Sequence, residues 1–382
     1  MNWDSRLLRH VDYSALLLTV LLIGMGMPII ASAVKAQGDS PTGDLFKQGM
    51  AAGLGFLLMA LLALIDYNEF PKLARALYYI NLLLLLLVRV PGIGINSKGA
   101  YRWIHFGPLQ FQPSEPAKVI MLITLANFLA KYMEDHERLD KWSDLILPTL
   151  HVLPAAALVM LQPDLGTSLV FIVMLAAMLY MAGVPGWRLA GIAIVGITLV
   201  SGIAYADLHW HVKIPLLQDY QIKRLACFVD PSADPNDACY QVTQGRIAIG
   251  SGGLWGKGLE KGTQNQLGFL VEQHTDWIFS VLGEELGFVG GTALLLVYFL
   301  LLARLIIIAI NAKDHFGLLL ATGVAAMFGF HVAENVGMVL GVMPAAGIPL
   351  PFISYAPSAL LTNLAALGIA LNVFMRRHTI MF

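Results

Sequence analysis

Long apolar stretches constrain this chain more than any other feature. Ten of them, each about 20 residues long, recur along the 382 residues, and a helix of that length crosses the roughly 30 Å hydrocarbon core of a bilayer. Hydrophobic residues make up 57% of the chain and charged residues only 13%, with a mean hydropathy of +0.70, so lipid must serve as its solvent. The sequence therefore predicts an all-α polytopic membrane protein.

The spans are expected to form a single transmembrane domain over residues 1–382, with a long loop at 207–276 between the seventh and eighth helices. The first span continues past any small-residue cleavage pattern, so we expect no cleaved signal peptide. The eighth is overlong, so its first turns should stand above the bilayer or the helix should tilt. The predicted spans are 13–35, 46–66, 74–91, 115–133, 144–162, 166–184, 189–206, 277–309, 316–341 and 358–375.

Basic residues in short loops predict the orientation, because they are enriched on the cytoplasmic side of a membrane. Cytoplasmic N- and C-termini put a basic residue in every inside segment, and they put the loop at 207–276 outside. The inside residues are Arg6, Arg9, Lys72, Arg75, Lys131, Arg138, Lys141, Arg188, Arg304, Lys313, Arg376 and Arg377.

One outer loop breaks this trend. The connection after the third span holds or adjoins Arg89, Lys98, Arg102 and Lys118, and positive charge kept outside against the usual bias indicates an anionic partner. Glu115 and Lys118 are three residues apart and share one helix face, although a capping acid beside a snorkelling lysine explains the same spacing. Asp164, near the start of the sixth span, is equally compatible with an N-cap.

The stretch from Gln244 to Phe279 carries most of the polar chemistry. Its glycines are followed by an acidic and imidazole cluster of Glu272, His274 and Asp276. Glycine lets a backbone approach a ligand closely, and successive N–H groups can bind an anion. A flexible connection is the simpler interpretation. A loop as long as 207–276 is usually functional, so we expect short helices in it, with the glycine-rich part folded over the bundle.

Other polar residues leave two interpretations open. Glu284, Glu285, His331, Glu334 and Asn335 fall within spans, where such side chains mark function or bond between helices. Cys227 and Cys239 lie in the outer loop, where a disulfide would persist. A bridge requires Cα atoms within about 7 Å, and two free thiols are the alternative. The net charge of -1 argues against nucleic-acid binding, and the cysteines give no metal-ligand spacing.

Four motifs carry a resemblance to a known family. Gly99-Ala-Tyr-Arg-Trp103 with Gln112-Pro-Ser-Glu-Pro-Ala-Lys118, then Gln162-Pro-Asp-Leu-Gly-Thr-Ser168, then Ile247 to Gln264 with its glycines, and then His274-Thr-Asp276 occur in this order on the outer side. The chain closely resembles the SEDS family of RodA and FtsW, and is more similar to its RodA members. The resemblance covers nearly the whole chain.

The resemblance implies a ten-span peptidoglycan glycosyltransferase of the cell (inner) membrane that polymerises lipid II into glycan strands during cell elongation. It also implies a class B penicillin-binding protein and other elongation-complex proteins as partners. Asp276 matches the family's catalytic aspartate, and Arg102, Glu115 and Lys118 match its charged cavity residues. Gln264 and His274 fall in the matching motifs, as further substrate-binding candidates. The chain departs from the family at Ser354-Tyr-Ala-Pro-Ser-Ala359, where Gly-Gly usually stands in place of Ala-Pro, so the backbone there should be stiffer.

The chemistry of glycan extension fits these residue types. A base must take a proton from the acceptor hydroxyl, and cations must stabilise the departing diphosphate. We expect Asp276 to be the base, Lys118 and Arg102 to hold the diphosphate, and Glu115 to orient Lys118. We also expect Lys118, Arg102 and Asp276 to line one cavity that opens to the outer face. No cofactor is required by the sequence, although a divalent cation could share the task. A lipid II flippase would use the same charges without a base, and an elongation-complex scaffold would need none of them.

Overall fold

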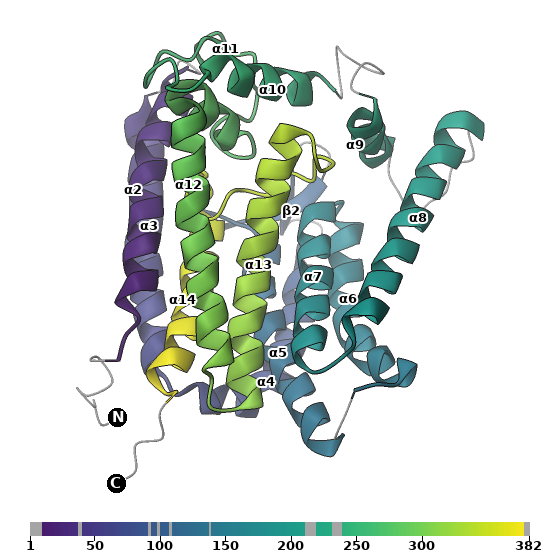
Figure 1. Ribbon diagram of the computed structural model, residues 1–382. Helices are drawn as coiled ribbons and strands as arrows, with labels where there is room; N and C mark the ends of the chain where they lie inside the picture. Colours follow the sequence, from purple (N-terminus) through teal and green to yellow (C-terminus); the bar gives the residue numbers. More distant parts are fainter. Residues whose placement is uncertain are drawn as a thin grey trace.

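Ten long helices form the bundle in the computed structural model, which describes residues 10–36, 40–90, 93–97, 100–106, 109–136, 139–210, 219–230 and 239–377. Each overlaps one predicted span, which confirms the fold class (Figure 1). Within the described residues nine helical spans are long and apolar enough to cross a membrane, and α7 is apolar but has 17 residues. The ten helices are α2 (Tyr13–Ala36), α3 (Pro41–Leu64), α4 (Phe70–Leu87), α5 (Ser114–Asp135), α6 (Ile146–Leu161), α7 (Leu165–Met181), α8 (Gly186–Trp210), α12 (Ile278–Ile310), α13 (His315–Leu340) and α14 (Pro357–Met375).

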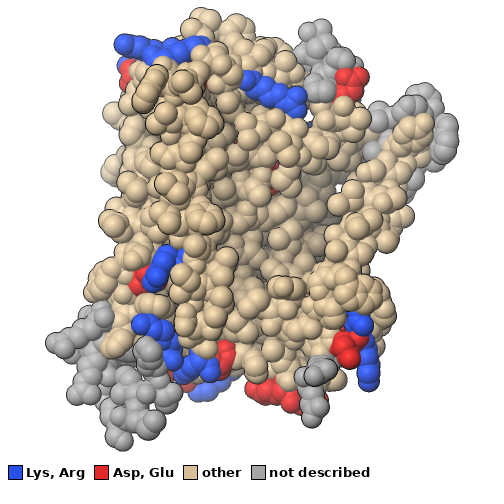
Figure 2. Space-filling view, viewed as in Figure 1, with Lys and Arg blue, Asp and Glu red and all other residues tan. Residues whose placement is uncertain are grey.

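The surface supports a transmembrane arrangement. Figure 2 shows charged side chains gathered toward the two ends of the visible face, with a broad band between them that is almost free of charge. Exposed leucines, isoleucines and valines are numerous along the helices, as expected where lipid replaces water. The chain is therefore a multi-pass membrane protein.

The interior of the bundle is built from α5, α13 and α14, the helices with the largest buried fractions. α14 packs along α3. A Cβ added at Gly368 of α14 would lie 2.5 Å from the carbonyl oxygen of Met59, so glycine is needed for this close approach. By contrast, α8 has no buried residue in its apolar window and leans away from the other helices (Figure 1).

A small sheet, absent from the sequence prediction, follows α4. It consists of β1 (Gly94–Ser97), β2 (Ala100–Phe106) and β3 (Leu109–Phe111), all antiparallel in the order β1-β2-β3. Residue types favoured in strands occur along β2, which contains Tyr101, Trp103 and Ile104. The sheet places Arg102 of β2 against the turn between α6 and α7.

The long loop contains the expected short helices. They are α9 (Asp219–Val229), α10 (Tyr240–Gly252) and α11 (Thr263–Gln266), and α10 and α11 lie across one end of the bundle (Figure 1). Two single-turn 3-10 helices, η1 (Tyr67–Glu69) and η2 (Trp142–Leu145), lie at the opposite end. Loop residues 211–218 and 231–238 lie outside the described part of the chain.

The helix of the overlong eighth span, α12, is broken near its start. Gly287 has φ 66° and ψ −165°, a backbone region essentially restricted to glycine. The break separates residues 278–286 from the long segment that follows and interrupts the helical hydrogen bonds there. Loop backbone replaces them: Lys257 N–H donates to the Glu284 carbonyl at 3.0 Å, and Phe288 N–H donates to the Gly253 carbonyl at 2.8 Å.

The glycine run therefore has a packing role that neither sequence interpretation included. A Cβ added at Gly256 would lie 2.1 Å from the Glu285 carbonyl oxygen, and one added at Gly287 would lie 2.3 Å from the Gly256 nitrogen. Glycine at both positions lets the loop backbone reach the broken helix. Residues 252–258 and the first part of α12 form one hydrogen-bonded unit.

Candidate active site

Asp276 lies in the turn immediately before α12 and is half-buried. Three consecutive carbonyls hold this turn: His274 accepts from Tyr355 N–H at 2.9 Å, Thr275 from the Ser354 hydroxyl at 2.6 Å, and Asp276 from the Asn335 side chain at 2.8 Å. The N-cap of α12 is Trp277, so Asp276 lies outside the cap position. The backbone is thus fixed independently of the Asp276 carboxylate.

Tyr355 supports the turn from the segment between α13 and α14. Its ring lies 5.5 Å from the His274 ring between centroids, and its hydroxyl donates to Asp44 at 2.9 Å. Burial, together with this hydrogen bond, raises the pKa of Tyr355, so the hydroxyl stays a neutral donor. The next residues are the unusual Ala-Pro pair, and Pro357 opens α14 at its first position, where proline is favoured.

The Asp276 carboxylate lies beside a guanidinium group. Gly347 has φ 73°, and a Cβ added there would lie 3.1 Å from Oδ2 of Asp276 and 3.5 Å from Nη1 of Arg224. The two side chains therefore flank the same glycine. Arg224 comes from α9 of the long loop and donates to the Ala345 carbonyl at 3.2 Å.

A cavity of about 190 Å³ lies next to this pair. It is lined by two guanidinium groups, Arg102 and Arg224, one carboxyl group, Glu334, and mainly apolar residues of α7, α13 and the segment 343–346. Glu334 accepts from Ala346 N–H at 2.8 Å, and its second oxygen is buried without a hydrogen-bond partner. Two arginines in a largely apolar cavity suit a phosphate group, because each can donate two parallel hydrogen bonds.

Arg102 is held by the turn between α6 and α7. It donates to the Gln162 carbonyl at 2.9 Å and also to the Pro163 carbonyl. Asp164 in the same turn caps α7 by accepting from Thr167 N–H at 3.1 Å, which confirms the N-cap interpretation. The family motif at this turn thus positions Arg102 at the cavity wall.

Lys118 lies deeper than the cavity. Its side chain is 1% exposed, and Nζ lies 2.9 Å from Oε1 of Glu115 and 3.3 Å from Nε2 of His331. His331 precedes Asn335 by four residues on α13, so the two share a helix face about 6 Å apart along the axis. Lys118 therefore lies about one turn below the Asp276 loop, within a buried ion pair.

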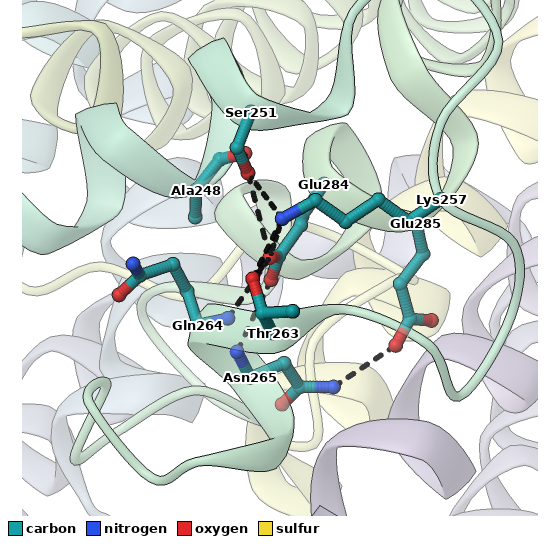
Figure 3. A network of polar contacts seen from close by, with 8 residues as sticks. All are labelled: Ala248, Ser251, Lys257, Thr263, Gln264, Asn265, Glu284 and Glu285. Carbon is teal, nitrogen blue, oxygen red and sulfur yellow. Dashed lines mark hydrogen bonds and ion pairs between the residues drawn. The ribbon is translucent and has the colours of Figure 1, made fainter.

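Gln264 belongs to a separate network around Glu284 (Figure 3). The fully buried Glu284 carboxylate accepts from Lys257 Nζ at 2.7 Å, Gln264 N–H at 2.9 Å and Asn265 N–H at 3.1 Å. The neighbouring Glu285 accepts from the Asn265 side chain at 3.0 Å. These contacts fasten the glycine-rich loop to the short segment of α12 that follows Asp276.

The six predicted site residues therefore divide into groups. Arg102 lines the cavity, Asp276 and His274 lie in the adjacent turn, Glu115 and Lys118 pair below it, and Gln264 belongs to the loop network. The sequence predicts that Lys118, Arg102 and Asp276 line one cavity, and only Arg102 does so. Lys118 is enclosed by α5 and α13, and Asp276 lies in the turn beside the cavity. Among the described residues, no three His, Cys, Asp or Glu side chains gather as a metal site would need.

Arg224 is the residue that sequence reasoning missed. It lies in a short helix without a recognisable motif, and the available signal was its position three residues before a cysteine. Cys227 and Cys239 form a disulfide with Cα atoms 5.1 Å apart, which confirms the bridged alternative. The bond joins α9 to the start of α10 and so restrains the helix that carries Arg224.

Known proteins are similar to this chain over nearly its whole length. Residues 13–379 match the model of the FtsW, RodA and SpoVE cell cycle proteins. The chain is 38% identical over 375 residues to the peptidoglycan glycosyltransferase MrdB of Escherichia coli (strain K12), covering 98% of this chain and 95% of that protein. It is 37% identical over 370 residues to the probable peptidoglycan glycosyltransferase FtsW of Geobacter sp. (strain M18), covering 96% and 97%.

Solved structures agree. The chain resembles one from a peptidoglycan synthase complex described as coordinating polymerization and crosslinking, with a TM-score of 0.78, 34% identity and coverage of 96% of this chain and 98% of that chain. It also resembles the Rod shape determining protein RodA of Thermus thermophilus, with a TM-score of 0.71, 32% identity and coverage of 99% and 100%. The protein is thus a polytopic membrane protein of the cell-wall synthase type. It belongs to the FtsW, RodA and SpoVE family, the SEDS family to which its motifs pointed.

Proposed function

We propose that this protein is an inverting peptidoglycan glycosyltransferase that polymerises lipid II during cell elongation. The observation that carries this proposal is the half-buried Asp276 carboxylate, held by a rigid turn beside Arg224 and next to a cavity with a second arginine. Relatives that cover nearly the whole chain are named peptidoglycan glycosyltransferases. Family and geometry support the same chemistry.

Asp276 acts as the general base in this proposal. Its carboxylate takes the proton from the acceptor sugar hydroxyl while the hydroxyl oxygen bonds to the anomeric carbon of the donor. The bond between that carbon and the diphosphate oxygen breaks on the opposite face, and the diphosphate leaves with the electron pair. General base catalysis contributes about 10²- to 10⁴-fold in rate.

The arginines stabilise the departing diphosphate. Arg102 and Arg224 line the cavity beside Asp276 and can present fixed donors where negative charge develops. Lys118 adds positive charge about one helical turn away from the Asp276 loop. It would contact the diphosphate directly only after its buried pair with Glu115 opens, because its side chain is enclosed in the present arrangement.

The partner is a class B penicillin-binding protein that cross-links the strands, and the site faces the outside of the cell membrane with both termini cytoplasmic. The orientation rests on the basic residues of the short loops. The choice of partner is inferred from the similarity to a chain of a complex described as coordinating polymerization and crosslinking. The long loop, with α9 to α11 over the site, is the outer surface nearest to Asp276.

Polymerisation of purified lipid II by the purified chain, alone and with the partner, tests the proposal. Glycan polymer that depends on this chain is the expected result. Movement of lipid II across a proteoliposome bilayer without polymer would favour the flippase. Neither activity, together with normal complex assembly, would favour the scaffold.

A further inference from the structure

A second cavity, of about 660 Å³, lies at the opposite end of the bundle from Asp276. It is lined by the first turns of α4, the last turns of α5 and His151 of α6. This is the end at which α2 begins and α14 ends (Figure 1), and the distribution of basic residues predicts it to be cytoplasmic. The proposed polymerisation chemistry uses none of its residues.

The cavity carries unpaired positive charge. Lys72 forms an ion pair with Glu69 at 2.6 Å, which leaves Arg75 and Lys131 as the lining cations. Both are exposed, and neither has a hydrogen bond or ion pair within the described part of the chain. Asp135 is the one acidic lining residue there. The lining groups therefore leave about one net positive charge, which matches the single negative charge of a phosphodiester.

Stacked rings form the inner wall of this cavity. The His151 ring lies 4.4 Å from the Tyr78 ring and 5.2 Å from the Phe128 ring, between centroids, and both pairs are stacked. His151 is held further by a 3.2 Å contact between Nε2 and the Thr124 hydroxyl. The wall is thus held by contacts among its own side chains, and it has the aromatic character of residues at the membrane–water interface.

One face of α4 continues from the cavity into the lipid-facing surface. Arg75, Tyr79, Leu83 and Leu86 follow a spacing of three or four residues and share that face. Tyr79 is 65% exposed and Leu83 is 57% exposed, so protein does not cover the stripe. It changes from cationic to aromatic to aliphatic along the helix, as the headgroup, interface and acyl chains of a lipid do. A soluble anion would make no use of the aliphatic part.

We propose that this cavity binds the phosphodiester headgroup of an anionic glycerophospholipid, with Arg75 and Lys131 contacting the phosphate and an acyl chain lying along Leu83 and Leu86. Basic cavities between transmembrane helices on the cytoplasmic side bind such headgroups. The charge balance, the aromatic wall and the amphipathic stripe of α4 point to the same class of ligand.

Native mass spectrometry of the purified full chain tests this site, with phosphatidylglycerol and phosphatidylcholine of identical acyl chains as probes. Phosphatidylglycerol should bind more tightly, and Arg75→Gln and Lys131→Gln should each weaken it roughly fivefold. Lys131→Arg should retain binding because it keeps the charge. Lys141→Gln is the matched control, because it removes an exposed lysine at the same end that does not line the cavity.

Three results would overturn the proposal. The first is equal binding of the two phospholipids, or a loss of phosphatidylglycerol binding in Lys141→Gln as large as the loss in Arg75→Gln. The second is full displacement by millimolar inorganic phosphate, which would indicate a site for soluble phosphate. The third is preferential displacement by a polyprenyl diphosphate, which would assign the cavity to the lipid-linked substrate. Thermal unfolding of each variant without added lipid shows whether the bundle is intact.

Discussion

Replacing Glu284 by Gln should release the glycine-rich loop from α12. Glutamine keeps the shape of the side chain but removes its charge and one acceptor oxygen. Glu284 accepts from Lys257 at 2.7 Å through Oε1 and from Asn265 N–H at 3.1 Å through Oε2. An amide cannot satisfy both donors equally, because its NH₂ group would face one of them.

The expected cost follows from those contacts. A hydrogen bond to a charged group contributes about 1.5–3 kcal/mol, and an unsatisfied buried donor costs about 1–3 kcal/mol. We take about 3 kcal/mol for the local opening, since Lys257 is one-quarter exposed and water partly replaces its contact. That free energy corresponds to an equilibrium constant for local opening that is larger by on the order of 100-fold, and to exchange faster by the same factor.

Hydrogen–deuterium exchange of a peptide covering α11 measures this directly, because Glu284 accepts from the N–H groups of Gln264 and Asn265. Glu260→Gln is the matched control: Glu260 forms an exposed ion pair with Lys35, which should contribute little. Unchanged exchange of these amides in folded Glu284→Gln would refute the reasoning.

Three further predictions concern stability. Gly287→Ala should lower the free energy of unfolding by at least about 2 kcal/mol, and with it the thermal unfolding midpoint, because its φ is positive and its Cβ would lie 2.3 Å from the Gly256 nitrogen. A normal midpoint would contradict the packing of the broken helix. Cys227→Ser with Cys239→Ser should speed proteolysis of the loop at 207–276, since the disulfide contributes about 3 kcal/mol in the chain-entropy model, and unaltered cleavage would count against that contribution. Lys118→Ala should destabilise the protein by about 3–5 kcal/mol, measured by thermal unfolding, because it strands a buried carboxylate; full stability would show that the carboxylate takes a proton or another partner.

The order of the helices was predictable because hydrophobic length is a local property of the sequence. Residue Asp276 was found through its motif, which is local too. The break at Gly287 was not predictable, since it depends on loop residues such as Gly256 reaching a helix about thirty positions later. The same limit explains why Arg224 was missed and why Lys118 was expected in the cavity: their positions depend on how α9, α5 and α13 pack against one another.

Sequence spacing also left the small sheet unassigned. Its strands are short, and the alternation in β2 spans only a few residues between two long helices. The disulfide remained one of two alternatives for a related reason. Pairing depends on the distance between Cα atoms, which the structure gives as 5.1 Å and which no spacing of Cys227 and Cys239 along the chain could supply.

The central claim is that Asp276 is the general base. Asp276→Asn keeps the side-chain size, and the backbone bond from Asn335 does not involve the carboxylate, so the variant should fold and bind its partner. Its rate of polymer formation from lipid II, measured with the purified complex, should fall about 10²- to 10⁴-fold, while Glu260→Gln should polymerise at the normal rate. Near-normal polymer from well-folded Asp276→Asn would contradict the account and favour a flippase or a scaffold.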